Sequence, residues 1–363
     1  MNSSFAMTER IPGAQSTLAE KIFTLRKAAK SKRLALIFPA LLCLSVAQLG
    51  AQTAEAPSAT EVARKLGFDD GEIAKIQNGE IVRKDLKEGA DSELAGVVAA
   101  FFKQPVGTLA EGALMGKFLD PSDPASQFHT WNPETPADEA FSGIALSDKE
   151  AGEVKNYSRA KAGSKLNLSE AEIAQFKKSK TDAASINAVL RATLKARYEA
   201  YRQSGLKGIA PYDRGGDDRS SPGDELRLAI NETKPASRRQ EYFEALLNYP
   251  ANPVPEMQHR FFWFKQRVED RPTFVLAHRA AVRIGENAAL VTEEQYYVSH
   301  SYNANFFAGG CLAVEGGTIV FYVNRTFTDQ VAGFGSGMKH SIGRGQMLSE
   351  VVSNLQKVRE KLK

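Results

Sequence analysis

Cysteine is nearly absent from this chain of 363 residues, which contains only Cys43 and Cys311. Cys43 lies in an N-terminal apolar segment, so removal of that segment would leave Cys311 alone and exclude an internal disulfide. A chain of this length can bury enough apolar surface to fold without disulfides. Cys311 lies in an apolar neighbourhood, where a lone thiol is more often inert packing than a nucleophile.

Motifs for metal binding, nucleophilic catalysis and cofactor binding are also missing. The histidines are scattered, with no HxH or HxxxH pair, at His129, His259, His278, His300 and His340. No G-x-S-x-G string offers the serine of a hydrolytic triad. Glycines at 333, 335 and 337 do not have the spacing of a dinucleotide loop, and no parallel βαβ pattern surrounds them. The sequence therefore predicts no metal and no cofactor, and it leaves any catalytic residue unknown.

The excess of basic residues is confined to the first 51 positions. The whole chain has 47 lysines and arginines against 43 aspartates and glutamates. Residues 1–51 hold 7 of the basic and 2 of the acidic residues, so the remainder has 40 against 41. Nucleic acids and anionic membrane surfaces favour a concentrated basic face, so this balance argues against both as partners.

The N-terminal segment has the pattern of a secretory signal peptide. A basic cluster at 26–33 precedes the apolar run at 34–51, which ends in small residues. The run is short for the ~20 residues of a membrane span, and Pro39 and Gln48 interrupt it. We expect a signal peptide at 1–51 that is cleaved near Ala51, giving a periplasmic or extracellular protein. An uncleaved anchor is the alternative, and no other apolar stretch is long enough to span a bilayer.

The first half of the remaining chain is predicted to be mainly helical. Residues 52–92 form an N-terminal helical segment, in which Ser58 caps the first helix and 81–86 could be a short strand. The apolar run 93–102 is a buried strand or, nearly as well, a helix, because periodicity alone does not separate the two. Residues 119–138 are rich in Pro, Asp and Ser and read as a loop. A helical insertion is expected at about 147–257, where 183–203 carries apolar residues at helical spacing.

The second half predicts an antiparallel sheet followed by a long helix. A strand meander is expected over about 258–325, with 273–284 a half-buried strand whose Arg279 and Arg283 lie on the polar face. Short turns between successive strands imply antiparallel pairing. The terminal helix, about 337–362, has an apolar stripe formed by Leu348, Val351, Val352, Leu355, Val358 and Leu362. The predicted fold class is α+β, with one domain at 93–362 whose sheet packs on the terminal helix.

This order of elements resembles that of the START-like helix-grip (SRPBCC) superfamily. The matching parts are a strand with a proline-led helix at 93–115, and the late meander with its terminal helix at about 258–362. The helical insertion between them departs from the usual plan of the family, and no diagnostic motif is present. The resemblance implies a curved sheet that wraps the terminal helix, with an apolar ligand or lipid pocket between them. It implies no catalytic residue.

Four side chains near the meander are candidates for the wall of such a pocket. If the strand continues, Tyr296, His300 and Tyr302 share one face, and His278 lies on the apolar face of the preceding strand. They could bind the polar end of a ligand, or one histidine could act as a general base. The alternative is that these residues are half-buried on the sheet and satisfy their polar atoms locally.

Arginine and aspartate residues in two loop segments have a structural interpretation. Arg214 lies in a glycine-rich loop, and Arg325 closes the last strand shortly before Asp329. Buried Arg–Asp pairs that hold loops together explain both segments without a functional role.

The function predicted from these observations is binding of a hydrophobic or lipid-like small molecule by an exported soluble protein. Two alternatives remain open. One is an envelope enzyme, hydrolase-like, with a histidine-centred site in the same region. The other is an envelope protein-interaction module without a pocket.

Overall fold

The computed structural model describes residues 56–118, 126–251, 253–333 and 335–363. The chain divides into two units, Met1–Thr53 and Ala54–Lys363, and the description below concerns the second. The predicted signal peptide lies outside the described residues.

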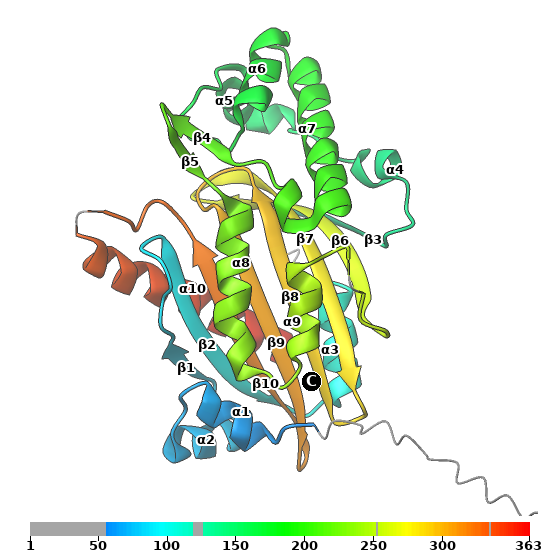
Figure 1. The fold of residues 1–363 in the computed structure, drawn as a ribbon, viewed down its shortest axis with the longest axis vertical. Helices are drawn as coiled ribbons and strands as arrows, with labels where there is room; N and C mark the ends of the chain where they lie inside the picture. Colours follow the sequence, from blue (N-terminus) through cyan, green and yellow to red (C-terminus); the bar gives the residue numbers. More distant parts are fainter. Residues whose placement is uncertain (1–55, 119–125, 252, 334) are drawn as a thin grey trace, which may run out of the picture. The chain divides into compact units, whose positions relative to one another are not determined.

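Within the described residues the core element is an eight-stranded sheet in which every neighbouring pair of strands is antiparallel (Figure 1). Its strands, in the order in which they lie across the sheet, are β1 (Val82–Asp85), β2 (Glu93–Phe102), β10 (Gly317–Phe327), β9 (Ala304–Val314), β8 (Ala288–Val298), β7 (Arg271–Ile284), β6 (Gln258–Val268) and β3 (Gln127–Trp131). The predicted meander is therefore confirmed, and the apolar run at 93–102 is a strand.

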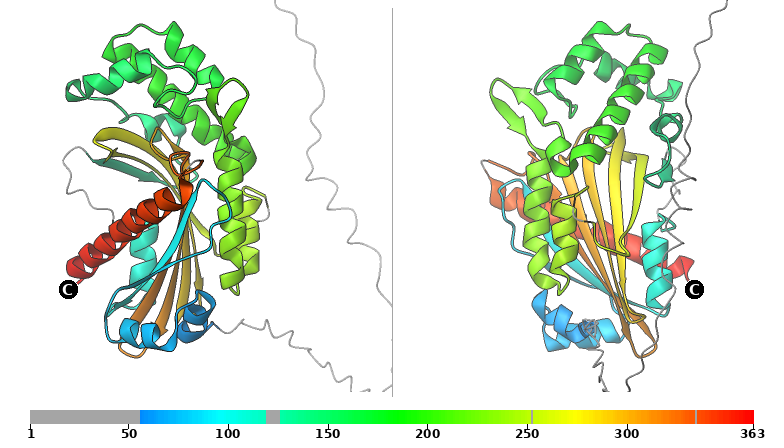
Figure 2. Two further views of the ribbon diagram at one scale, coloured as in Figure 1. Left: turned by 90° about the vertical axis from the view of Figure 1, so that its left-hand side faces the viewer. Right: turned by 45° about the vertical axis from the view of Figure 1, so that its right-hand side comes forward.

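Helices cover both faces of this sheet. The face of α8 (Pro222–Thr233) also carries α1 (Ala59–Lys65), α2 (Asp70–Gln77) and α9 (Gln240–Leu247), and the opposite face carries α3 (Val106–Leu114) and α10 (Ser336–Lys361) (Figure 2). The terminal helix is thus confirmed almost to the residue. In the segment 52–92, β1 lies within 81–86, where a short strand was considered, and the helices α1 and α2 precede it.

The first part of the predicted helical insertion packs around one long helix, α7 (Ala183–Ser204). Its other helices are η1 (Asp148–Glu150), α5 (Ala151–Ser158), α6 (Glu170–Lys178) and η2 (Gly205–Gly208), and α4 (Ala137–Phe141), which precedes the predicted boundary, also packs on α7. The later helices of the insertion, α8, η3 (Lys234–Ala236) and α9, contact one another instead. A capping box formed by Ser169 and Glu172 begins α6, as their spacing predicts. The insertion also contains a small hairpin of β4 (Tyr212–Gly215) and β5 (Asp218–Ser220).

Two sequence expectations for strands are wrong. The segment 119–138 was expected to be a loop, but Gln127–Trp131 pairs with β6 as an edge strand. The strand at 273–284 was expected to be half-buried, but most of β7 is buried on both faces. The reason is that α3 covers the face that carries Arg279, so a charged residue lies inside.

A glycine in β2 sets how closely the terminal helix approaches the sheet. A Cβ atom on Gly96 would lie 2.6 Å from Cδ2 of Leu348, so only glycine accepts this leucine without a shift. The apolar stripe of α10 buries Leu348, Val351, Leu355 and Val358. Because α10 packs chiefly on β1 and β2, the strands farther across the sheet are not covered by it directly.

Candidate functional site

A cavity of about 340 Å³ lies between the sheet and the pair α3 and α10. Its volume is within the range of about 300–1,000 Å³ typical of small-molecule sites. Most of the lining is apolar and comes from both helices and the central strands, including Leu109, Val291, Phe307, Val320, Val351 and Leu355. This is the position in which the helix-grip resemblance places a pocket.

A buried ion pair supplies the charged part of the cavity wall. Arg279 of β7 lines the cavity, and Glu293 lies directly opposite it on β8. The two residues are 7% and 4% exposed, and Nε of the arginine donates to Oε2 of the glutamate. Nη1 of Arg279 also donates to the carbonyl oxygen of Ala113 in α3 at 2.5 Å. The arginine is therefore fixed from both the sheet and the helix.

A short hydrogen-bonded chain extends the ion pair along the sheet. Nε2 of Gln295 donates to Oε1 of Glu293 at 2.7 Å, and the hydroxyl of Tyr302 donates to Oε1 of Gln295 at 2.7 Å. Both carboxylate oxygens of Glu293 thus have donors. The ion pair is a polar patch without net charge, because the arginine and the glutamate neutralise each other. Further polar residues line other parts of the cavity, namely Ser126, Gln127, Lys265, Gln266 and Asn354.

The thiol of Cys311 also lines the cavity. Burial raises its pKa to about 12, so at neutral pH the residue is a neutral thiol. This agrees with the interpretation of Cys311 as packing rather than as a nucleophile.

None of the four side chains proposed as pocket lining contacts this cavity. His278 and Tyr296 lie on the opposite face of the sheet, where both contact Tyr201 of α7. Tyr302 reaches the cavity region only through Gln295. Their assignment to one face is wrong for two reasons. The pairing of β7 with β8 shifts register so that Leu276 faces Tyr297 and Ala277 faces Gln295, which makes Tyr296 the extra residue of a bulge and breaks the alternation. β8 then ends at Val298, and the chain turns at Ser301, whose φ is 72°. A role of these residues in ligand binding stays a prediction.

His300 fits the alternative interpretation, in which these residues satisfy their polar atoms locally and have no role in binding. It follows the end of β8, and its Nε2 lies 2.9 Å from Oγ1 of Thr273 while its Nδ1 lies 2.6 Å from Oγ of Ser301. Burial, assisted by Arg271, lowers its pKa. Both ring nitrogens therefore have local partners, as expected for a structural histidine.

The sequence did contain a signal for the ion pair that was missed. The turn at 285–287 joins β7 to β8, and the pairing begins with Ile284 opposite Ala288. Counting back equal numbers of residues on each strand places Arg279 opposite Glu293. Opposite charges in directly paired positions stabilise a sheet, which is the pattern that identifies a buried pair.

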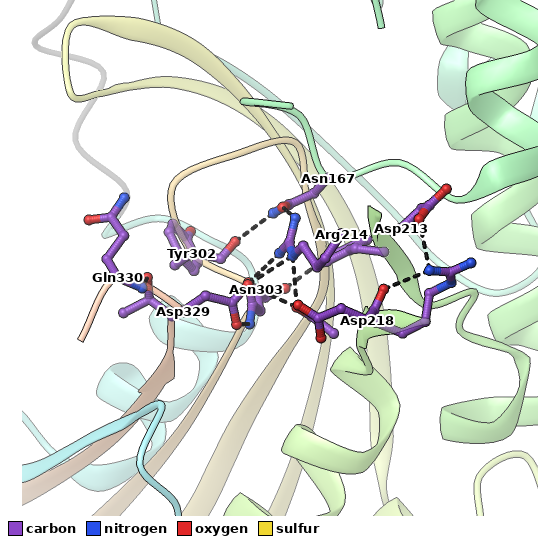
Figure 3. A network of polar contacts seen from close by, with 12 residues as sticks. Asn167, Asp213, Arg214, Asp218, Tyr302, Asn303, Asp329 and Gln330 are labelled. Carbon is purple, nitrogen blue, oxygen red and sulfur yellow. Dashed lines mark hydrogen bonds and ion pairs between the residues drawn. The ribbon is translucent and has the colours of Figure 1, made fainter. Parts of the chain in front are cut away.

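A second polar network lies where the loops at one end of the sheet meet the helical insertion (Figure 3). Arg214 is its centre: Nε lies 2.8 Å from both Oγ of Ser220 and Oδ2 of Asp329. Nη1 donates to Asn167 at 2.9 Å, and Nη2 donates to Asn303 at 2.8 Å. Arg214 therefore pairs with an aspartate that joins two loops, but with the 49% exposed Asp329 of the other segment and not with its neighbour Asp213, whose partner is Arg219.

The same network contains a carboxyl group with an altered pKa. Nδ2 of Asn303 donates to Oε1 of Glu225 at 2.9 Å and to Oδ1 of Asp329 at 2.8 Å. Burial, with a smaller effect of Asp329, raises the pKa of Glu225 to about 8. Arg325 does not pair with Asp329, since its partner is Glu93 of β2.

Metal-site geometry, helix hydrophobicity and similarity to known proteins do not point to a further site. Within the described residues, no group of three or more His, Cys, Asp or Glu side chains is arranged to hold a metal ion. No helix in that part of the chain combines the length and apolar character needed to cross a membrane. No family model, curated protein or solved structure matches this chain.

Proposed function

We propose that this protein binds an apolar small molecule in the cavity between α10 and the sheet. The observation that carries the proposal is the cavity of about 340 Å³ with its mainly apolar lining. The START-like order of elements supports the same location. Burial of the ligand's apolar surface would provide most of the binding free energy.

The Arg279–Glu293 pair indicates the chemistry of the ligand's polar end. A carboxylate on the ligand would compete with Glu293 for Arg279 and leave a buried glutamate without its counter-ion, which is costly. A neutral hydrogen-bonding group, such as a hydroxyl, ester or amide, fits beside the pair without this cost. We therefore propose a ligand with an aliphatic or aromatic body and an uncharged polar group.

Filling the cavity tests this proposal. In Cys311→Phe the new ring enters the cavity, and we expect binding of the neutral dye N-phenyl-1-naphthylamine to weaken at least about tenfold, equivalent to about 1.4 kcal/mol. The matched control is Ala313→Phe, because Ala313 lies on the same strand but is exposed and outside this cavity. Fluorescence titration of both variants gives the comparison. Equal dye affinity in a folded Cys311→Phe variant and in the unaltered protein would refute the site.

We also propose that the protein is exported with cleavage near Ala51. The support is the basic cluster and apolar run that precede this position. Such a cut would leave every described helix and strand intact, since α1 begins at Ala59. N-terminal sequencing of the protein from the producing cell is expected to begin at Gln52. Retention of the apolar run 34–51 in the membrane fraction would contradict cleavage.

A further inference from the structure

A hydrogen-bonded chain of four titratable side chains crosses the face of the sheet opposite the cavity. Nδ1 of His259 (β6) lies 2.9 Å from Nε2 of His278 (β7). Nδ1 of His278 lies 2.8 Å from the hydroxyl oxygen of Tyr201 (α7). That hydroxyl also bonds to Oε2 of Glu294 (β8). The four groups therefore form one continuous path for a proton.

The path leads from the protein surface to a fully buried carboxyl group. His259 is half-buried, whereas His278, Tyr201 and Glu294 are at most 1% exposed. Among the described residues, none hydrogen-bonds to Nε2 of His259. At the other end, Oε1 of Glu294 has no hydrogen-bond partner in the part of the chain that the structure describes. The interior end thus has one donor for a carboxyl group, which is too few to hold a carboxylate firmly.

Only two arrangements of the hydrogens satisfy this chain, because the hydroxyl of Tyr201 has a single proton to donate. Burial is the main cause that raises the pKa of that hydroxyl well above 10, and the nearby Glu294 raises it further, so the hydroxyl stays protonated. If it donates to an ionised Glu294, it must accept from Nδ1 of His278. If Glu294 is protonated and donates to the hydroxyl oxygen, the tyrosine donates to Nδ1 of His278 instead.

We propose that these four residues are a proton relay that loads Glu294 from the solvent through His259. A proton from water binds Nε2 of His259, and its Nδ1 proton passes to Nε2 of His278. The Nδ1 proton of His278 then passes to the oxygen of Tyr201. The original hydroxyl proton passes to Oε2 of Glu294. The net change is one proton on the carboxyl group and reversed tautomers of two neutral histidines.

The surroundings favour storage of the proton on the glutamate rather than on a histidine. Burial lowers the pKa of His278 well below its usual range, and it also lowers that of His259. Burial raises the pKa of Glu294 to about 7, and its hydrogen bond from Tyr201 opposes this only in part. A proton is therefore retained at the interior end close to neutral pH.

The remaining titratable groups near the relay are tyrosines and two arginines. The tyrosines are Tyr198 (α7), Tyr242 (α9), Tyr249 after α9 and Tyr296 (β8). One arginine is Arg260 of β6, whose Nη1 donates to the backbone carbonyl oxygen of His259 at 2.9 Å. The other is Arg202 of α7, which donates to the hydroxyl of Tyr198 at 2.8 Å and to the carbonyl of Pro133 at 2.6 Å. Its positive charge disfavours a cationic His259 or His278, which again directs the proton inward.

Breaking the relay at its centre gives the decisive comparison. In the unaltered full chain, we expect the tautomer of His259, measured by ¹⁵N NMR, and the protonated carboxyl band of Glu294, measured by infrared spectroscopy, to change with one common midpoint near pH 7. Tyr201→Phe should separate the two midpoints by at least one pH unit. The matched control is Tyr296→Phe, because the ring of Tyr296 stacks on Tyr201 at 4.1 Å but its hydroxyl has no hydrogen-bond partner among the residues described. The control should keep the common midpoint, and unrelated midpoints in the unaltered protein would overturn the relay.

A second variant keeps the test decisive if Tyr201→Phe does not fold. Glu294→Gln removes the proton acceptor, so His259 should keep one tautomer through neutral pH. Between pH 4.5 and about 7 the folded protein binds more protons at Glu294 than the unfolded chain, so this residue makes stability fall as pH rises through that window. Glu294→Gln should remove this fall. A tautomer change in His259 that persists in Glu294→Gln would overturn the relay.

Discussion

Replacement of Arg325 by methionine is expected to destabilise the protein by about 3–5 kcal/mol, because it leaves a buried glutamate without its counter-ion. Glu93 is fully buried in β2, and its Oε1 accepts from Nη1 of Arg325 on the neighbouring strand at 2.7 Å. The only other donor among the described residues is the backbone N–H of Gly89, 2.5 Å from Oε2. The lower free energy of unfolding is measured by urea denaturation at neutral pH.

Two further variants show whether the loss comes from the buried charge. Lys84→Met breaks a pair with Glu72 whose side chains are 32% and 25% exposed, and it should cost less than about 1 kcal/mol. In the double variant Glu93→Gln with Arg325→Met, no buried charge is left, so much of the stability should return. An Arg325→Met variant that loses no more stability than Lys84→Met would contradict the explanation.

Replacement of Arg214 by methionine is expected to cost about 2–4 kcal/mol, through lost hydrogen bonds to charged donors rather than through a lost ion pair. The carboxylate of Asp329 is 49% exposed, so its pairing with Arg214 contributes little. Asn167 and Asn303 are instead buried, and each gives its side-chain oxygen to the guanidinium group. Without Arg214 both oxygens lose this donor. Urea denaturation and local hydrogen exchange at 299–303 measure the effect.

An arginine in a fully exposed pair provides the control for this variant. Arg64 pairs with Asp70 at 3.0 Å, and the two side chains are 63% and 83% exposed, so Arg64→Met should change the stability by less than about 1 kcal/mol. Arg214→Lys keeps the positive charge, but the lysine lacks the planar guanidinium group that donates to several acceptors at once. This variant should therefore retain only part of the stability that Arg214→Met loses. Full stability in Arg214→Lys would show that charge alone matters and would contradict the hydrogen-bond account.

The order of the elements could be predicted because each has a local cause. The stripe of α10 repeats with helical period, and the capping box at Ser169 fixes the start of α6. The edge strand β3 was missed because it lies in a segment rich in proline and polar residues and pairs with β6, more than 120 residues later. Pairing over such a distance leaves no local pattern in the sequence.

The site was less predictable than the fold because exposure depends on a second layer of structure. Alternation in β7 correctly places Arg279 on the face opposite His278, but it does not say that α3 covers that face. The position of the cavity depends on how α10 crosses the sheet. Gly96 allows α10 to approach the sheet at this point, but the sequence does not indicate that Leu348 is the residue packed against it. The sequence pattern led to histidine and tyrosine residues as pocket lining. In the structure Arg279 lines the cavity instead, and Glu293 holds that arginine in place.

The place of β2 in the sheet has a consequence for when the protein can fold. Its partner is β10, and Phe102 pairs with Thr318, a separation of 216 residues. The strands β6 to β10 can pair in succession as they are synthesised, but β2 and β1 remain without a neighbour on that side until nearly the whole chain is available. Closing so long a loop is a late and slow event in folding. We expect the nascent chain to stay incompletely folded until its synthesis is almost finished.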